Sequence, residues 1–309
     1  MSIRSKLKHA LTVSRDPRWW PFYLQRRFMQ PQRRAWLAQQ IARMRPPAGT
    51  FQRVDSNQLR HATEIAEHGI THLPPPLSVE QCSELVNYFS SKDVYDPYRT
   101  ETAPFKPLGP GRHPNSHIAH HYPEDIVQAP HLLALANSPE VLSVVERFLG
   151  CKPSLAYMAA WWSYATPLGA QQAEFYHRDV DDWRFIKLFV YLTDVDVEAG
   201  PHVYVSQSSQ DPTLSTIRRF SDEEVAKHFK PEQIRVLTGK AGDAFLEDTF
   251  GIHKGQPVQR GQRLLFQAVY TMFALPYSPI RPVASHNEIQ QRLPELALDT
   301  WVNRFYLEL

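Results

Sequence analysis

The sequence predicts a mainly β fold with helical additions. Helical patterns occur early in the chain. From about residue 154 onward, the pattern changes to short apolar runs separated by turns that Pro and Gly mark. Early helices followed by many short strands are typical of a β sandwich or barrel with helices packed outside it. With 42% hydrophobic residues among 309, the chain can build a sizeable core, and no apolar run approaches the length of a bilayer span.

We expect three parts along the chain: a basic, aromatic, helical extension over residues 1–68, a main domain over residues 69–273, and a tail with a docking helix over residues 274–309. Residues 1–60 hold 13 Lys and Arg against two Asp, a net charge of +11, so the rest carries −9 of the total of +2. The basic arm favours peripheral contact with a membrane surface or a protein partner, or packing on the main domain or a second subunit, so we expect a monomer or homodimer. Because the larger part is acidic, we do not expect nucleic acid as a partner.

The cysteine content and the start of the chain indicate the compartment. Cys82 and Cys151 are the only cysteines, too few for a disulfide framework or a thiolate metal site. The first residues show no apolar signal-peptide region followed by a small-residue cleavage site. We therefore expect a cytoplasmic protein.

Capping signals mark the expected helices. Gln32 to Met44 has a partial apolar stripe within the extension, and the capping-box pattern of residues 78–81 precedes apolar residues at helical spacing. Ser138 and Gly150 suit the two ends of another helix. We expect residues 92–130 to form a long loop. Its histidines are expected to be surface or lid residues, with a second metal site as the alternative: His113, His117, His120 and His121.

Apolar segments of three to thirteen residues predict the strands, at 154–166, 185–193, 202–205, 234–237, 244–246 and 263–273. In the segment 185–193, apolar residues occupy both the odd-numbered and the even-numbered positions, as expected of a strand covered on both faces. Lys187 interrupts this pattern. Because burying an unpaired ammonium group costs several kcal/mol, Lys187 either reaches solvent or meets an acid, and an anionic co-substrate is one candidate. In the segment 154–166, side chains alternate between the two faces of the strand, so only the aromatic residues at every second position can face inward.

Two metal-binding side chains lie two residues apart, in His177-Arg178-Asp179. In a strand, residues i and i+2 point to the same face, so one imidazole and one carboxylate would project together. These are two thirds of the facial triad that holds Fe(II) and leaves coordination positions open. His253 is the candidate third ligand and His202 its weaker rival, while Asp181 and Asp182 are competing carboxylates.

An ordered set of features resembles the phytanoyl-CoA dioxygenase-like family of Fe(II)/2-oxoglutarate oxygenases. The set comprises the H-x-D motif, the YLTDVD strand end at 191–196, Gly200-Pro201, a Gly-Asp turn at 242–243, the distal His253 and the trailing Arg263, and the likeness covers Gly69 to Phe273. The resemblance implies a double-stranded β-helix, a jelly-roll barrel. It also implies that the catalytic metal ligands are His177, Asp179 and His253, with Fe(II), 2-oxoglutarate and O₂ as cofactor and co-substrates.

The far carboxylate of 2-oxoglutarate needs a cation, for which a guanidinium offers a planar two-donor fork. By the resemblance this residue is Arg263, with Arg260 as the alternative and Lys187 as an additional cofactor-binding candidate. Lys254 to Gln256 occupy the place where the family often has Ser or Thr, and residues 206–209 replace its GSH-like stretch.

The resemblance implies hydroxylation of a small, lipid-like or secondary-metabolite substrate, with release of succinate and CO₂. Related halogenases lack the carboxylate ligand, so the presence of Asp179 favours hydroxylation. The alternatives are a cupin-like metalloenzyme that does not use 2-oxoglutarate, and a non-catalytic barrel that serves as a scaffold or binding protein. A zinc hydrolase is less favoured, because no general base is evident beside the site.

Overall fold

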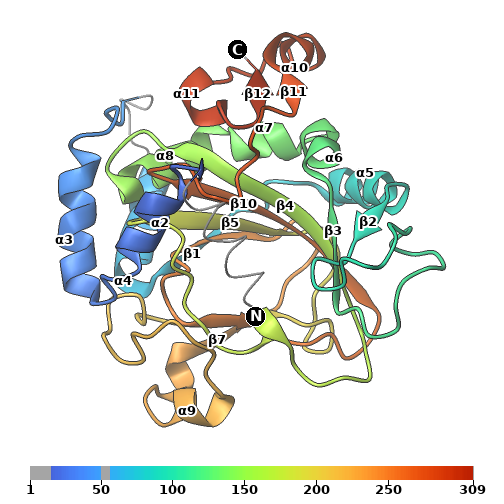
Figure 1. Cartoon of the computed structure of the whole chain (residues 1–309), viewed down its shortest axis with the longest axis horizontal. Helices are drawn as coiled ribbons and strands as arrows, with labels where there is room; N and C mark the ends of the chain where they lie inside the picture. Colours follow the sequence, from blue (N-terminus) through green and yellow to red (C-terminus); the bar gives the residue numbers. More distant parts are fainter. Residues whose placement is uncertain (1–14, 50–55, 309) are drawn as a thin grey trace.

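The computed structural model describes residues 15–49 and 56–308. Its centre is a barrel made of a large and a small antiparallel sheet. The large sheet contains β1 (Ile70–Leu73), β2 (Val94–Tyr95), β3 (Ile118–His121), β4 (Ser154–Tyr164), β5 (Phe185–Tyr191), β8 (Ala244–Glu247) and β10 (Gln262–Thr271). The small sheet contains β6 (His202–Val205), β7 (Ile234–Leu237) and β9 (His253–Gly255). The strand orders are β1-β8-β5-β10-β4-β3-β2 and β7-β6-β9 (Figure 1), which confirms the predicted mainly β fold with helical additions.

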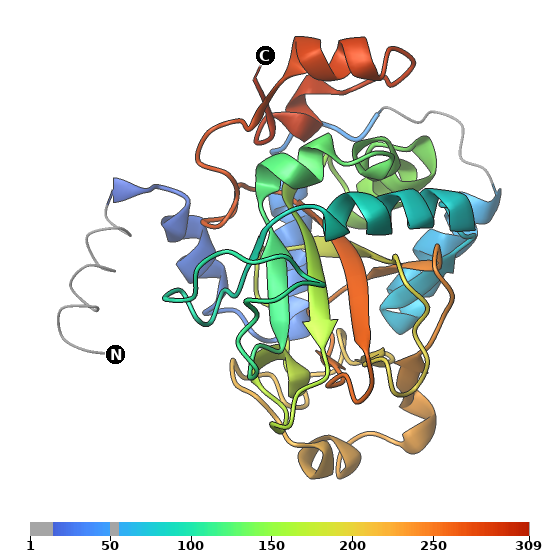
Figure 2. The same ribbon diagram turned by 90° about the vertical axis from the view of Figure 1, so that its right-hand side faces the viewer.

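Helices surround this barrel. Those before and between the first strands are α2 (Trp19–Gln25), α3 (Pro31–Ala42), α4 (Ser56–His68), α5 (Val79–Ser90), α6 (Pro123–Gln128), α7 (Leu132–Ala136) and α8 (Pro139–Leu149). The later elements are the 3-10 helices η1 (Gln172–Glu174) and η2 (Pro231–Gln233), α9 (Asp222–Ala226), α10 (His286–Arg292), α11 (Thr300–Asn303) and a small pair of strands, β11 (Ala284–Ser285) and β12 (Leu307–Glu308). The C-terminal elements lie at the end of the molecule opposite α9 (Figure 2). No helix in the described ranges is long and apolar enough to cross a membrane.

The helix signals in the sequence correspond to real caps. The Ser78 side chain and Gln81 form both bonds of a capping box at the start of α5. The hydroxyl of Ser138 accepts a bond from the backbone N–H of Val141, and Gly150 ends α8 in the left-handed conformation, with φ of 75°. The long loop expected over residues 92–130 is wrong in part, because it contains β2, β3 and α6. β3 is held by pairing with β4, and β2 by pairing with β3, and these tertiary contacts leave no period in the sequence.

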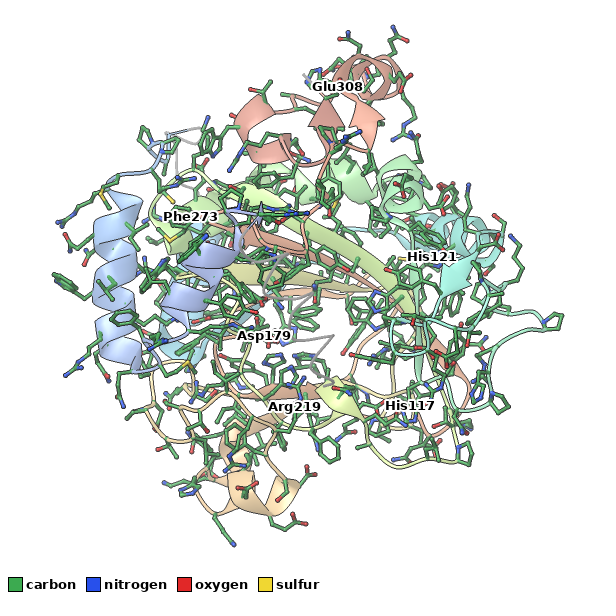
Figure 3. The ribbon with its side chains drawn as sticks, viewed as in Figure 1. His117, His121, Asp179, Arg219, Phe273 and Glu308 are labelled. Atoms are coloured by element: carbon green, nitrogen blue, oxygen red, sulfur yellow. The ribbon has the colours of Figure 1, made fainter. Side chains whose placement is uncertain are left out.

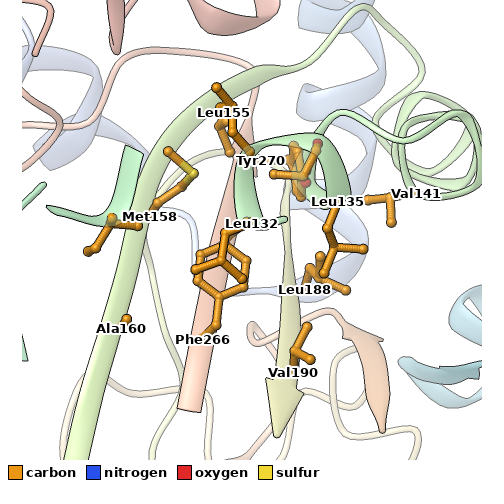
Figure 4. Packing of buried hydrophobic residues seen from close by; sticks show 14 of the residues in the cluster. Leu132, Leu135, Val141, Leu155, Met158, Ala160, Leu188, Val190, Phe266 and Tyr270 are labelled. Carbon is orange, nitrogen blue, oxygen red and sulfur yellow. The ribbon is translucent and has the colours of Figure 1, made fainter. Parts of the chain in front are cut away.

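The large sheet is buried on both faces. On its outer face, Leu188 and Val190 of β5 and Phe266 of β10 pack against helices of the α6–α8 region (Figure 4). On its inner face, Phe189 and Tyr191 pack in a second cluster with Tyr204 of the small sheet. Lys187 shares the parity of Phe189 and Tyr191, so the strand directs an ammonium group into the barrel.

The N-terminal helices pack on the barrel. Ala38 and Ala42 of α3 and Ile65 of α4 belong to the main apolar cluster. The Gln25 side-chain amide donates to the carbonyl of Val180, directly after the H-x-D motif, at 2.7 Å. Other aromatic and apolar side chains of this region remain outside: Trp20, Trp36 and Met44 are 68%, 61% and 76% exposed.

Asp182 joins the segment before β5 to the end of β10. Its buried carboxylate accepts bonds from the backbone N–H groups of Trp183 at 2.8 Å, Met272 at 2.7 Å and Phe273 at 2.8 Å. Replacement by alanine leaves these donors without an acceptor. We expect Asp182→Ala to lower the free energy of unfolding by about 3 kcal/mol, measured by urea denaturation. The control, Asp194→Ala, removes an exposed carboxylate that pairs with Lys240 and accepts from the Ala241 N–H, which water can replace, so a much smaller change of the midpoint is expected. Equal midpoints for the two variants would contradict this assignment.

Candidate metal centre

The H-x-D motif lies beside the distal histidine through backbone pairing. His177 N–H donates to the His253 carbonyl at 2.9 Å, and His253 N–H donates back at 3.0 Å. Asp179 N–H donates to Thr249 O at 2.9 Å. The regular strand expected around His177 is absent from this segment, where two isolated bridges, His177 to His253 and Tyr176 to Phe220, replace it. The bridge to His253 is enough to bring two candidate ligands together, because it places side by side two residues that are 76 positions apart in the sequence.

Three predicted ligands converge in this arrangement. The candidate ligand atoms of His177, Asp179 and His253 all lie within 4.8 Å of one another. The Asp179 carboxylate is 3.5 Å from His177 Nε2 and 3.3 Å from His253 Nε2. All three residues lie largely inside the protein, with the two imidazoles buried. The set of two imidazoles and one carboxylate is the donor combination of open, non-haem iron sites.

Both imidazoles are held in the tautomer that a metal requires. His177 Nδ1 lies 2.9 Å from the carbonyl oxygen of Phe175, and His253 Nδ1 lies 3.0 Å from that of Gly251. A carbonyl only accepts, so each Nδ1 carries the proton and each Nε2 lone pair faces Asp179. Burial, followed by the neighbouring His253, lowers the pKa of His177 to about 3, which keeps this imidazole neutral. Gly251 itself permits the close approach of Tyr204, whose hydroxyl would lie 2.2 Å from an added Cβ.

Lys187 pairs with carboxylates beside the metal ligands. Its ammonium group donates to Asp179 Oδ2 at 2.6 Å and lies 3.0 Å from Asp181 Oδ2. Burial opposes the charge of Asp179, but Lys187 and the two histidines hold the pKa of this carboxyl well below its ordinary value. Tyr277, from the C-terminal segment, lies beside Asp181. The structure therefore gives Lys187 an acid partner within the chain, and the competing carboxylates Asp181 and Asp182 have other partners.

A second buried pair lies next to this cluster. His202 Nε2 is 2.9 Å from Glu247 Oε2, and the rings of His202 and His253 stack with centroids 5.4 Å apart. Glu247 is opposite Lys187 in the register of β8 and β5. Burial raises the pKa of Glu247 to about 8 and lowers that of His202 to about 3, so both are neutral at pH 7. Sequence reasoning missed Glu247, although its two-residue spacing from Phe245 indicates an inward side chain.

Arg263 is a buried cation without an acid partner. Its guanidinium donates to the Gly200 carbonyl and, at 3.1 Å, to the Ser163 hydroxyl, and its Nε has no hydrogen-bond partner. No carboxylate in the described ranges forms an ion pair with it, and burial lowers its pKa. Gly200 has φ of 73°, and a Cβ there would lie 2.6 Å from Gln256 O, so this turn requires glycine. Arg260 is exposed and pairs with Glu198 at 2.9 Å.

The loop histidines do not join the triad. His117 lies 2.9 Å from Glu174 and 2.8 Å from Thr166, His121 accepts from Trp162, and His120 stacks on Trp161 with centroids 5.5 Å apart. His113 is exposed. Within the described residues, the triad is the only group of three side chains placed to hold a metal. The second metal site that the sequence left open is therefore not formed by these histidines as they lie.

Aromatic residues of one parity line the barrel interior. Trp161 is paired with Leu265 of β10 and with His120 of β3, and Tyr157 is paired with Val269. Trp162 and Tyr164 face the opposite way, into the outer core. The register thus selects which aromatic side chains of β4 face the interior.

A cavity of about 760 Å³ near the N-terminal helices lies outside this site. It is bordered by α3, α4 and α8 and contains none of the triad residues. The barrel residues around the triad, not this cavity, carry the candidate chemistry.

The triad predicts a selective loss of metal binding. We expect Asp179→Asn to weaken binding of Co(II), a spectroscopic substitute for Fe(II), by more than tenfold, because a neutral amide replaces the only anionic ligand. Asp181→Asn, which removes a neighbouring carboxylate, is expected to retain Co(II) binding within a few-fold. Visible absorption during a Co(II) titration measures both. If Asp181→Asn is the variant that loses binding, the ligand assignment is wrong.

The raised pKa of Glu247 predicts a pH-dependent contribution to stability. Its folded pKa of about 8 exceeds the ordinary value of 4.5, so the folded state binds more protons between these values. This contribution is fully present below pH 4.5 and is lost as pH rises through 8. We expect the stability of the wild type relative to Glu247→Gln, measured by urea denaturation of metal-free protein, to fall from pH 5 to pH 8. A constant difference would contradict a buried, protonated Glu247.

Comparison with known proteins gives structural likeness without sequence likeness. No protein-family model matches the sequence, and no curated protein matches it significantly. Among solved structures, the chain is similar to the epimerase SnoN in complex with Fe³⁺, α-ketoglutarate and nogalamycin RO, with 17% identity, a TM-score of 0.49, and 79% of this chain and 93% of that chain covered. It is also similar to HygX from Streptomyces hygroscopicus with nickel and 2-oxoglutarate bound, with 15% identity, a TM-score of 0.49, and coverage of 73% and 89%. For EctD from S. alaskensis with bound Fe, the identity is 18%, the TM-score 0.48, and the coverage 73% and 82%.

Proposed function

We propose that this protein is an Fe(II)- and 2-oxoglutarate-dependent dioxygenase that hydroxylates a small molecule. The observation that carries this proposal is a pair of features inside one barrel. A triad of two imidazoles and one carboxylate is oriented for a metal, and a buried arginine without an acid partner supplies a cation for a second anion. A cupin-like enzyme without 2-oxoglutarate accounts for the first feature but not for the second.

The triad residues would hold iron through His177 Nε2, Asp179 and His253 Nε2. Three protein ligands leave positions for a chelating co-substrate and O₂. When bound, iron with 2-oxoglutarate and O₂ supplies the oxidation, releasing succinate and CO₂ and placing a hydroxyl group on the substrate. Asp179 as a ligand favours hydroxylation over halogenation, and the ordered set of motifs favours a relative of the phytanoyl-CoA dioxygenase-like family.

The remaining residues bind, orient and exclude water. Arg263 would bind the far carboxylate of 2-oxoglutarate with a guanidinium that Gly200 and Ser163 already orient. Leu265, two residues further along β10, belongs to the apolar cluster of the barrel interior with Phe189 and Tyr191. This cluster excludes water, which strengthens the interaction of the guanidinium with an anion. Lys187 neutralises the carboxylates around the metal position.

We base the proposed cellular compartment on the state of the two cysteines. Cys82 and Cys151 are buried and free. A reducing cytoplasm suits a protein with unpaired thiols.

The test needs no substrate. Fe(II) and 2-oxoglutarate are added to the protein under anaerobic conditions, and the visible metal-to-ligand charge-transfer band is recorded. We expect the band in the wild type and its loss in His177→Ala. We expect Arg263→Ala to need roughly 10- to 100-fold more 2-oxoglutarate, because it lacks charged hydrogen bonds worth about 1.5–3 kcal/mol.

Arg260→Ala is the matched control, since it removes an exposed guanidinium three residues away. It should require the same 2-oxoglutarate concentration as the wild type. Iron binding without a band would reject the use of 2-oxoglutarate and favour the cupin-like alternative. Failure to bind iron would favour a non-catalytic barrel.

A further inference from the structure

Backbone pairing places Arg219 beside a metal ligand. The N–H of Phe220 donates to the carbonyl of Tyr176 at 2.8 Å, and the two residues form an antiparallel bridge. In an antiparallel pair, one step forward on one chain matches one step back on the other, so Arg219 is opposite His177. Residues opposite each other project to the same face. His177 faces the triad, and Arg219 therefore projects toward the same region.

Electrostatics agrees with this placement. After burial and His253, the charge of Arg219 is among the groups that depress the pKa of His177. Burial raises the pKa of Tyr98, and the charge of Arg219 counteracts this rise. The guanidinium therefore acts on both His177 and Tyr98. Figure 3 shows Asp179 and Arg219 toward the centre of the same view. Arg219 is exposed, unlike Arg263, so its guanidinium is open to solvent.

Arg219 forms no ion pair among the described residues, because the nearby acids have other partners. Glu174 pairs with His117 at 2.9 Å. On the following segment, Glu224 pairs with Arg218 at 2.7 Å and Asp222 pairs with Lys254 at 2.7 Å. An exposed cation on the side of the triad, with these three carboxylates engaged elsewhere, is available for an anionic group from solution.

An aromatic surface lines the same barrel interior toward which Arg219 projects. The charge of Arg219 acts on Tyr98, which follows Tyr95 by three residues in the sequence. The Tyr95 ring lies 6.1 Å from His120, whose ring is stacked on Trp161 at 5.5 Å with an interplanar angle of 9°. All of these rings except Tyr98 come from β2, β3 and β4, on the face directed into the barrel. A substrate held at Arg219 thus meets flat π surfaces that favour a ring.

We propose that Arg219 binds an anionic group, a carboxylate or a phosphate, of the small-molecule substrate, whose ring-bearing body lies on the aromatic surface of Tyr95, Tyr98, His120 and Trp161. This inference rests on the proposed function and names the substrate class of that site. Arg263 remains the residue for 2-oxoglutarate, since it is buried at the start of β10, whereas Arg219 is exposed in the segment between β6 and β7.

The test uses three probes of matched shape, with the anaerobic complex of protein, Fe(II) and 2-oxoglutarate. They are 3-phenylpropionate, 2-phenylethyl phosphate and the neutral 3-phenylpropionamide. Binding is measured by isothermal titration calorimetry and by the change in the charge-transfer band. We expect both anions to bind wild-type protein roughly tenfold or more tightly than the amide, because a charged hydrogen bond is made only by the anions. The tighter anion identifies carboxylate or phosphate as the recognised group.

Arg219→Gln is expected to bind all three probes as weakly as the wild type binds the amide, with an unchanged 2-oxoglutarate requirement. Arg218→Gln is the matched control, an exposed neighbour paired with Glu224, and should keep the preference for anions. The inference is wrong if none of the probes binds, if the amide binds as well as the anions, or if Arg219→Gln raises the 2-oxoglutarate requirement. An absent band in the wild type would refute the proposed function instead, and calorimetry with metal-loaded protein would still report the Arg219 contribution.

Discussion

The site depends on how the barrel compensates one buried ammonium group. Lys187 is 7% exposed and lies between the carboxylates of Asp179 and Asp181. An isolated lysine in this position would be unstable as a cation, and two isolated carboxylates would repel each other. Together the three groups compensate most of the desolvation cost. The pairing requires that the strand carrying Lys187 and the segment carrying both aspartates lie side by side, so the electrostatics and the topology of the site depend on each other.

The backbone positions the other side chains of the site. The paired bonds between His177 and His253 hold two distant segments in register, and carbonyl groups of Phe175 and Gly251 orient the two imidazoles. Asp182, next to the carboxylates of the site, is fixed by backbone N–H groups at the end of β10. Side chains held by the main chain need little reorganisation when a ligand enters, which is the condition for an effective pre-formed site.

Two arginines illustrate how burial distinguishes roles within one barrel. Arg263 is enclosed, oriented by a carbonyl and a hydroxyl, and so suits an anion that every turnover requires. Arg219 is exposed, in a segment between β6 and β7 where residue identity is less constrained by packing, and so suits a group that differs between substrates. Their separation gives the proposed co-substrate and substrate different cations.

The sequence by itself determined six of the ten strands that the structure describes in the two main sheets, the main helix caps and the H-x-D pair of candidate ligands, because apolar runs, capping residues and the H-x-D spacing are local signals. It also placed Arg263, through a motif order that resembles a known family. It could not assign a partner to Lys187, since Asp181 and Asp179 meet it only through the packing of the segment before β5. The short strands β2 and β3 were missed because they form by pairing, β3 with β4 and β2 with β3, and not by propensity. Glu247 and Arg219 likewise acquire their roles only from register, because a side chain's neighbours across a sheet are set by tertiary structure and not by its place in the chain.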